Sequence, residues 1–234
     1  DRSSAASDVY KRQEYKRDTL PFSQRFIHRL GVEGRAGYIF QTSPFLEYSN
    51  HQYKAMKNAY AGHLKYSFQL RPHTVADQAY IGAYQGIGVG YFNFGNPEEL
   101  GNPLAVYLFQ GGRIAQFSPR ISLNYEWNFG ASFGWKPYDE YDNPENQIIG
   151  SKVNAYLNVN LYLKWALSPK FDLMIGATGS HFSNGNTQYP NSGLNTVDCK
   201  VGLVYNFNRR ADELAQSWQH PIVPPFPRHV SYDL

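Results

Sequence analysis

The chain has 234 residues, a formal net charge of +3 and an aromatic content of 16%, mainly from 19 Tyr and 15 Phe. Its mean hydropathy of −0.53 and its lack of any apolar run near ~20 residues exclude a helical membrane protein. Abundant aromatic residues argue against a disordered chain. The 22 Lys+Arg are spread among 19 Asp+Glu without a basic block, so no nucleic-acid partner is expected. One cysteine excludes a disulfide framework.

The two ends of the chain differ in composition from the middle. Residues 1–17 are rich in Ser and charged residues without apolar periodicity, so we expect a disordered or non-native segment there. Residues 209–234 form a Pro-rich tail, in which 211–218 is expected to be a short helix. The last residues resemble the start of a further, truncated segment. This leaves 18–208 for the folded domain.

In the middle of the chain, eight segments alternate between apolar and polar residues with period two, which is typical of strands with two different faces. In chain order they are 26–40, 60–70, 80–93, 104–115, 121–135, 153–167, 171–183 and 193–207. The clearest is 153–167, where every odd position is apolar and most even positions are Asn, Tyr or Lys. Most segments exceed the roughly five or six residues of soluble strands and can cross a bilayer with tilt.

Two classes of barrel fit such strands, and they differ in which face is outside. A soluble barrel of the lipocalin kind has its apolar faces inside, around a ligand. A narrow membrane barrel has a polar, filled lumen and an apolar outer band. The polar faces include Asn154, Asn158, Lys164 and Glu126, which suit a lumen better than the surface of a soluble protein.

Connection lengths and tryptophans favour the membrane barrel. If the first strand starts in the periplasm, the connections after strands one, three, five and seven face outside and are expected to be longer. They are 41–59, 94–103, 136–152 and 184–192, against 71–79, 116–120 and 168–170. Trp127, Trp135 and Trp165 suit the interfacial aromatic girdles of such a barrel better than a sugar-stacking platform. We therefore predict an all-β fold, an eight-stranded antiparallel transmembrane β-barrel of the outer-membrane type with its apolar face outward.

Two polar residues, His181 and Ser183, interrupt the apolar face of the seventh segment. Side chains at i and i+2 lie on the same side of a strand, so the imidazole can reach the hydroxyl, as a general base must to activate a serine. Asn195 shares the parity of the apolar residues in the eighth segment, and aligning the two apolar faces brings it beside His181. All three are then expected on the lipid-facing wall near the outer leaflet, where the available ester is in lipopolysaccharide.

The surrounding string is more specific than a His-X-Ser tripeptide. His181-Phe-Ser-Asn184, followed by Pro190-Asn-Ser-Gly193 and Asn195, resembles the active-site hairpin of the lipid A 3-O-deacylase and acyloxyacyl hydrolase family of outer-membrane enzymes. The close resemblance covers about residues 176–207. It implies an eight-stranded barrel whose Ser-His-acid triad removes an ester-linked acyl chain from lipid A, with Ser183 as nucleophile and His181 as base. The family's acid is Glu, and its position falls on Asn195.

An oxyanion or substrate-binding site is expected just after the nucleophile. We place it at the backbone N–H groups around Asn184, Gly185 and Asn186, with a side-chain amide from Asn184 or Asn191. Ordinary turn chemistry is the alternative role for these residues. Asp198 has even parity and is expected to face the lumen, so it is a poor substitute for the missing acid.

Other residues that attract attention have simpler explanations. The remaining histidines are scattered without metal-ligand spacing, so we expect no metal and no cofactor. Gly86, Gly88 and Gly90 alternate along a strand and are expected to relieve crowding in the lumen rather than to bind a phosphate.

Two functional hypotheses follow from the sequence. The first is a serine esterase, a carboxylic ester hydrolase, that deacylates the lipid A of lipopolysaccharide in the bacterial outer membrane. The second is a catalytically silent outer-membrane barrel with a structural or lipid-binding role, which Asn195 at the acid position favours. The sequence leaves open a homodimer and the position of the cleaved ester.

Overall fold

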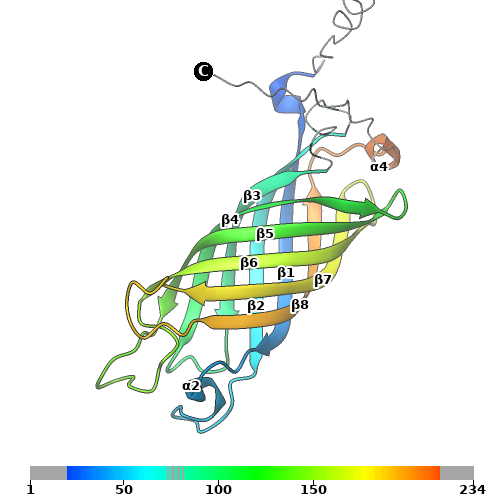
Figure 1. Cartoon of the computed structure of the whole chain (residues 1–234). Helices are drawn as coiled ribbons and strands as arrows, with labels where there is room; N and C mark the ends of the chain where they lie inside the picture. The colour runs from blue at the N-terminus through cyan, green and yellow to red at the C-terminus, as the bar shows by residue number, and fades with distance from the viewer. Residues whose placement is uncertain (1–19, 73, 75–76, 78–79, 81, 217–234) are drawn as a thin grey trace, which may run out of the picture.

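The structure is a computed structural model in which residues 20–72, 74, 77, 80 and 82–216 are described. Its eight antiparallel strands form a closed barrel in which sequence neighbours pair and β8 pairs with β1 (Figure 1). The strands are β1 (Phe26–Ile39), β2 (Asn58–Leu70), β3 (Tyr84–Asn93), β4 (Gly101–Gln116), β5 (Ile121–Trp135), β6 (Val153–Ala166), β7 (Phe171–Ser183) and β8 (Leu194–Asn206). The predicted fold class is therefore confirmed.

Short helical segments lie outside the barrel wall. They include η1 (Phe22–Gln24), α2 (Pro44–Glu47) and α4 (Asp212–Gln216). Within the described residues, none of the helices has the length and apolar character needed to cross a membrane. The segment α4 lies within the helix predicted for 211–218, whereas the N-terminal segment 1–17 and the Pro-rich run 220–227 fall outside the described residues.

The predicted boundaries fail between β2 and β4. The strand β3 begins at Tyr84 rather than at residue 80, because a turn precedes it: Ala83 N–H donates to Tyr80 O (2.7 Å), and Gly82 has a φ of +65°. The strand β4 begins at Gly101, earlier than predicted. The connection 71–83 is consequently longer than 94–100, so the predicted alternation of long and short connections is wrong at this pair.

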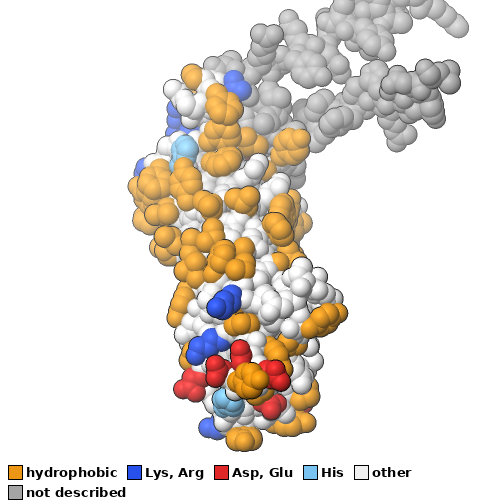
Figure 2. Space-filling model, turned by 90° about the vertical axis from the view of Figure 1, so that its left-hand side faces the viewer, with side chains coloured by type: hydrophobic (Ala, Val, Ile, Leu, Met, Phe, Trp, Pro, Cys, Tyr) orange, Lys and Arg blue, Asp and Glu red, His pale blue; other side chains and the backbone are white. Residues whose placement is uncertain are grey.

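The parity of the wall is as predicted for a membrane barrel. At the middle of β6, Val159 is 65% exposed while its neighbours Asn158 and Asn160 are buried inside. Figure 2 shows hydrophobic side chains over the wall, and Asp and Glu gathered at the end that carries α2 in Figure 1. The negative mean hydropathy of the chain (−0.53) is therefore the average of an apolar outer face and a polar lumen.

One tryptophan departs from this parity. Trp135 was expected in an outer girdle but is only 4% exposed. Gly134 just before it has a φ of +87°, and the pairing of β5 with β4 shifts register there, so the alternation of faces is reversed. The indole stacks on Phe94 (5.6 Å between centroids) and donates a hydrogen bond to Ser132 Oγ (2.8 Å). The other two predicted girdle tryptophans remain exposed.

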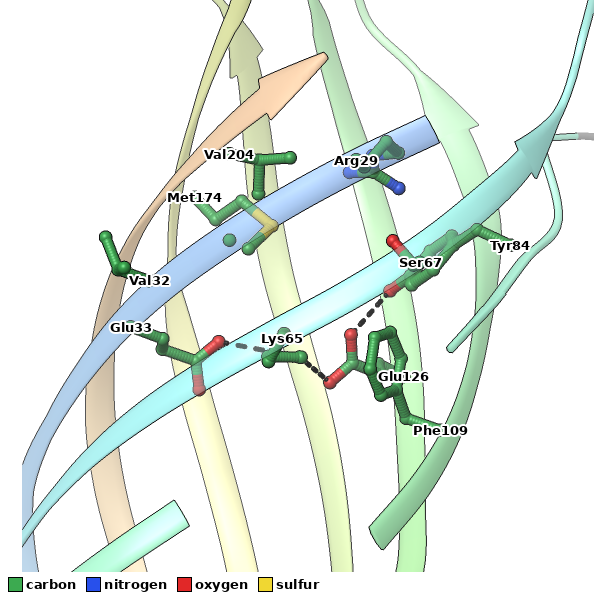
Figure 3. Close-up of a pocket in the computed structure, with 11 residues that line it drawn as sticks. Arg29, Val32, Glu33, Lys65, Ser67, Tyr84, Phe109, Glu126, Met174 and Val204 are labelled. Atoms are coloured by element: carbon green, nitrogen blue, oxygen red, sulfur yellow. Dashed lines mark hydrogen bonds and ion pairs between the residues drawn. The ribbon is translucent and has the colours of Figure 1, made fainter. Parts of the chain in front are cut away.

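The lumen is held together by a buried network of opposite charges. Glu33 accepts a hydrogen bond from Arg35 Nε (2.6 Å) and lies 2.8 Å from Lys200 Nζ. Lys65 lies 3.8 Å from the same carboxylate and pairs with Glu126 on its other side (Figure 3). Buried charges are tolerated only when they are paired, so this network fixes the strands that carry it.

Side chains fill most of the remaining lumen. A Cβ on Gly88 would lie 2.4 Å from the Tyr107 ring, and one on Gly90 would lie 2.6 Å from the imidazole of His63. These glycines therefore relieve crowding, as predicted. The cavity beside Glu33 and Lys65 (Figure 3) measures about 10 Å³, which is room for roughly one water molecule, so it is too small to be a substrate site.

The segment after β8 is tied to the barrel end opposite α2 (Figure 1). Arg209 pairs with both carboxylate oxygens of Asp172 at 2.7 and 2.9 Å. Glu213 of α4 pairs with Arg71, which follows β2. Because these groups are largely buried, they anchor α4 to this end.

The charge network predicts that neutralising one of its carboxylates strongly lowers the free energy of unfolding. Glu33→Gln leaves Arg35 and Lys200 without the carboxylate that they share, so the free energy of unfolding should fall by about 3–5 kcal/mol. Urea unfolding in lipid vesicles measures this. Glu140→Gln, at an exposed position of the β5–β6 loop, is the control and should change little. If Glu33→Gln lowers the free energy of unfolding by less than about 1 kcal/mol, the charge network does not stabilise the barrel as inferred.

The orientation of the wall gives a second prediction. Val159→Lys puts a charge at the middle of an outward face, which should cost about 2–4 kcal/mol of unfolding free energy in vesicles. Tyr141→Lys, in the exposed β5–β6 loop, introduces the same charge outside the barrel wall and should be neutral. Equal stability of the two variants would mean that the wall does not face lipid.

Candidate active site

The outer face of the β7–β8 hairpin carries a line of three hydrogen-bonded polar side chains. The strand register pairs His181 directly with Asn195. The imidazole Nδ1 lies 2.7 Å from Asn195 Oδ1, and Nε2 lies 2.9 Å from Ser183 Oγ. The structure therefore brings together the three residues that parity placed on one face, while their catalytic roles remain predictions.

The partner on each side of the imidazole determines where its proton lies. An amide oxygen can only accept, so Nδ1 of His181 carries the hydrogen that it donates to Asn195. In the neutral imidazole Nε2 is then an acceptor and receives the hydrogen bond from the Ser183 hydroxyl. This is the protonation pattern that general-base activation of a serine requires.

The strand end that carries the site is anchored from inside the barrel. Phe182, between the two outward-facing residues, points inward and is fully buried. Its ring packs against Phe92 (5.0 Å), Tyr156 (5.1 Å) and Trp135 (5.2 Å between centroids). Because neighbouring side chains on a strand face opposite ways, this aromatic packing helps to hold His181 and Ser183 outward.

The surroundings of the three polar residues are apolar. On β6, Ala155 pairs with Ser183, and the exposed Leu157 pairs with His181. On the other side, the N–H of the exposed Phe40 donates to the carbonyl oxygen of Asn195 (3.0 Å). The three half-buried polar side chains are therefore surrounded by the apolar, lipid-facing wall.

The predicted oxyanion residues lie together in the β7–β8 loop, residues 184–193. The backbone N–H of Asn184 donates to Asn191 Oδ1 (3.0 Å), and its side-chain amide donates to Gln188 O (2.7 Å). The Asn191 amide donates to Asn186 Oδ1 (3.0 Å), and Gly185 and Asn186 have positive φ. In this conformation the Asn184 N–H and the side-chain amides of Asn184 and Asn191 serve turn chemistry, so an oxyanion role for these three groups requires an exchange of partners.

Gly193 is closer to the base than its place in the sequence string indicated. It has a φ of +72°, and a Cβ built on it would lie 3.1 Å from His181 Cε1 and 3.7 Å from Ser183 Cβ. The backbone of Gly193 therefore packs against the edge of the imidazole. The only sequence signal for this contact is a glycine directly before a strand, which is also common in ordinary turns.

Among the described residues, the side-chain hydrogen bonds of His181 go to Asn195 and Ser183 and not to a carboxylate. Asp198 faces the lumen as predicted, where it accepts a hydrogen bond from Thr196 (2.8 Å). No group of three or more His, Cys, Asp or Glu side chains among the described residues is placed to hold a metal ion.

Comparisons with known proteins identify the family. The outer membrane enzyme PagL aligns with a TM-score of 0.47 at 13% identity, covering 74% of this chain and 97% of that one. Neisserial surface protein A gives 0.45 at 11% identity (78% and 96%), and the N-terminal β-barrel domain of Pseudomonas aeruginosa OprF gives 0.42 at 9% (76% and 97%). No curated protein sequence matches. The family model for lipid A 3-O-deacylase (PagL) matches residues 29–206, from β1 to β8, so the chain belongs to this family of bacterial outer-membrane proteins.

Proposed function

We propose that the protein is a serine esterase that removes an ester-linked acyl chain from lipid A in the outer leaflet. The supporting observation is the hydrogen-bonded line of Ser183, His181 and Asn195 on the outer wall. Family membership supports the reaction class. The apolar frame around the line supports a substrate whose ester lies at the edge of the hydrocarbon.

The proposed reaction proceeds in two halves. Ser183 Oγ attacks the ester carbonyl carbon while His181 Nε2 takes the hydroxyl proton, and a tetrahedral intermediate forms. Its collapse breaks the bond to the alcohol oxygen of the ester, which receives the proton from Nε2 and leaves as an alcohol. Water then attacks the acyl-serine with the same base, releasing a fatty acid and restoring Ser183. No metal or cofactor has a part in this scheme.

The acid of a triad both orients the imidazole and stabilises the imidazolium, and Asn195 can perform only the first of these tasks. Its Oδ1 accepts the Nδ1–H of His181 at 2.7 Å, so the ring is oriented with Nε2 toward the serine. An amide carries no charge, so it cannot stabilise the imidazolium that forms in the transition state as a carboxylate does. We therefore infer a correctly oriented but slower enzyme than one with Glu at this position.

The second candidate is a catalytically silent barrel that binds lipid or serves a structural role. The observation that favours it is the same missing charge at Asn195. In that case the hairpin geometry would persist without turnover.

The nucleophile is tested by one conservative change. Ser183→Ala removes the attacking oxygen, so fatty-acid release from lipopolysaccharide by purified protein in detergent should fall by at least about 10³-fold. Ser192→Ala, an exposed serine of the same hairpin, should retain release within about twofold. Wild-type release in the Ser183→Ala protein would show that another group carries the chemistry.

The missing charge is tested by restoring it. Asn195→Glu supplies a carboxylate beside His181 and should raise kcat by about 10²-fold, because the imidazolium is then stabilised. Gln188→Glu adds the same charge to the exposed loop and should leave kcat near the wild-type value. Silence of both the wild type and Asn195→Glu would favour the binding barrel over the enzyme.

A further inference from the structure

We infer that Asn146 is a positioning residue for His181, acting through the β5–β6 loop and Gly193; the inference rests on the proposed function of the hairpin. Asn146 belongs to a loop, residues 136–152, that no feature of the sequence connects to the candidate site. Among the hydrogen bonds of the described residues, its side chain makes none to the three polar residues of that site. Its connection to them passes through two backbone contacts and one packing contact.

The first step is the side chain of Asn146, which is fully buried. Its amide nitrogen donates to Glu99 O (3.1 Å) and to Lys136 O (2.9 Å). Its amide oxygen accepts from the N–H groups of Ile148 (3.0 Å) and Ile149 (3.2 Å). One side chain therefore fastens the β5–β6 loop to the β3–β4 loop and fixes the direction of the backbone at 147–149.

The second step joins this loop to the β7–β8 loop. The carbonyl of Gln147 accepts the N–H of Ser192 (3.2 Å), and that of Ile148 accepts the N–H of Gly193 (3.1 Å). Ile148 is fully buried, so its backbone cannot shift without moving packed side chains. The segment 192–193 is thus held by carbonyls whose own positions depend on Asn146.

The third step is the packing of Gly193 against the base. A Cβ on Gly193 would lie only 3.1 Å from His181 Cε1, so the backbone at 193 lies close to the edge of the imidazole and a side chain there would press on the ring. Two residues later, Asn195 holds the other side of the ring. A shift of 192–193 therefore changes both the edge contact and the Nδ1 hydrogen bond, and errors of about 1 Å in such geometry can lower rates by about 10²-fold.

Asn143 provides a matched control. Its buried side-chain amide donates to Glu99 O (2.9 Å), Pro137 O (3.0 Å) and Lys136 O (3.4 Å), which include both carbonyls that Asn146 uses. Its side chain makes no contact with the backbone at 147–149 among the hydrogen bonds of the described residues. If the substitutions acted only by loosening the β5–β6 loop, they would lower activity equally at Asn143 and Asn146. A positioning role predicts a larger loss at Asn146.

The experiment compares Asn146→Ala with Asn143→Ala in detergent-purified protein. Asn146→Ala should lower kcat on lipopolysaccharide by about 10- to 100-fold with little change in KM, and slow fluorophosphonate labelling of Ser183 in proportion. Asn143→Ala should stay within about threefold in both. Asn146→Ser, whose hydroxyl can still accept an N–H two residues on, should recover part of the loss. Equal kcat values for Asn146→Ala and wild type, or equal losses in the two Ala variants, would overturn the inference.

A second measurement does not depend on turnover. The Nδ1–H resonance of His181, observed by NMR in micelles, should be lost or shifted in Asn146→Ala and kept in Asn143→Ala. If Asn146→Ala fails to fold, Asn146→Ser serves in its place, with a smaller shift expected. An unchanged resonance overturns the positioning role even when the wild type proves inactive. Failure of the proposed function appears differently, as identical lipid release and labelling in the wild type and Ser183→Ala.

Discussion

The closed antiparallel ladder is the constraint on which every other feature depends. Closure pairs the backbone polar groups of all eight strands, which is what a wall in contact with lipid requires. It also leaves each side chain only two directions, toward lipid or into the lumen. Charged residues such as Glu33 and Lys200 therefore meet inside. A polar residue on the outer face, such as His181, stands among apolar neighbours.

The two-residue period explains which parts of the structure the sequence could predict. It predicted the strands, the outward face of β6 and the approach of His181 to Asn195, because each follows from parity alone. It failed where the backbone leaves the period: Gly134, with positive φ, turns Trp135 inward, and the turn before Tyr84 delays β3. The two-residue period could not predict the loop contacts of Asn146 either, because loop sequences have no periodicity that relates one loop to another.

In the proposed mechanism, Asn195 performs only one of the two tasks of a triad acid. Ring orientation needs only an acceptor at Nδ1, and Asn195 supplies one. Charge stabilisation needs a carboxylate, and the nearby Asp198 has the wrong parity to give it. Strand register therefore sets the direction of the imidazole, whereas a negative charge beside the ring depends on which residue occupies position 195.

The interior is arranged so that structural charge and candidate chemistry lie at different places. Arg35 pairs with Glu33 in the charge network and donates a hydrogen bond to the Tyr156 hydroxyl (3.1 Å). The Tyr156 ring in turn stacks on Phe182, whose neighbours on β7 are His181 and Ser183. Aromatic rings thus lie between Arg35 and the end of β7 that bears the candidate site. The ion pairs fix the wall from within, and packed rings support the end of the strand that carries His181 and Ser183.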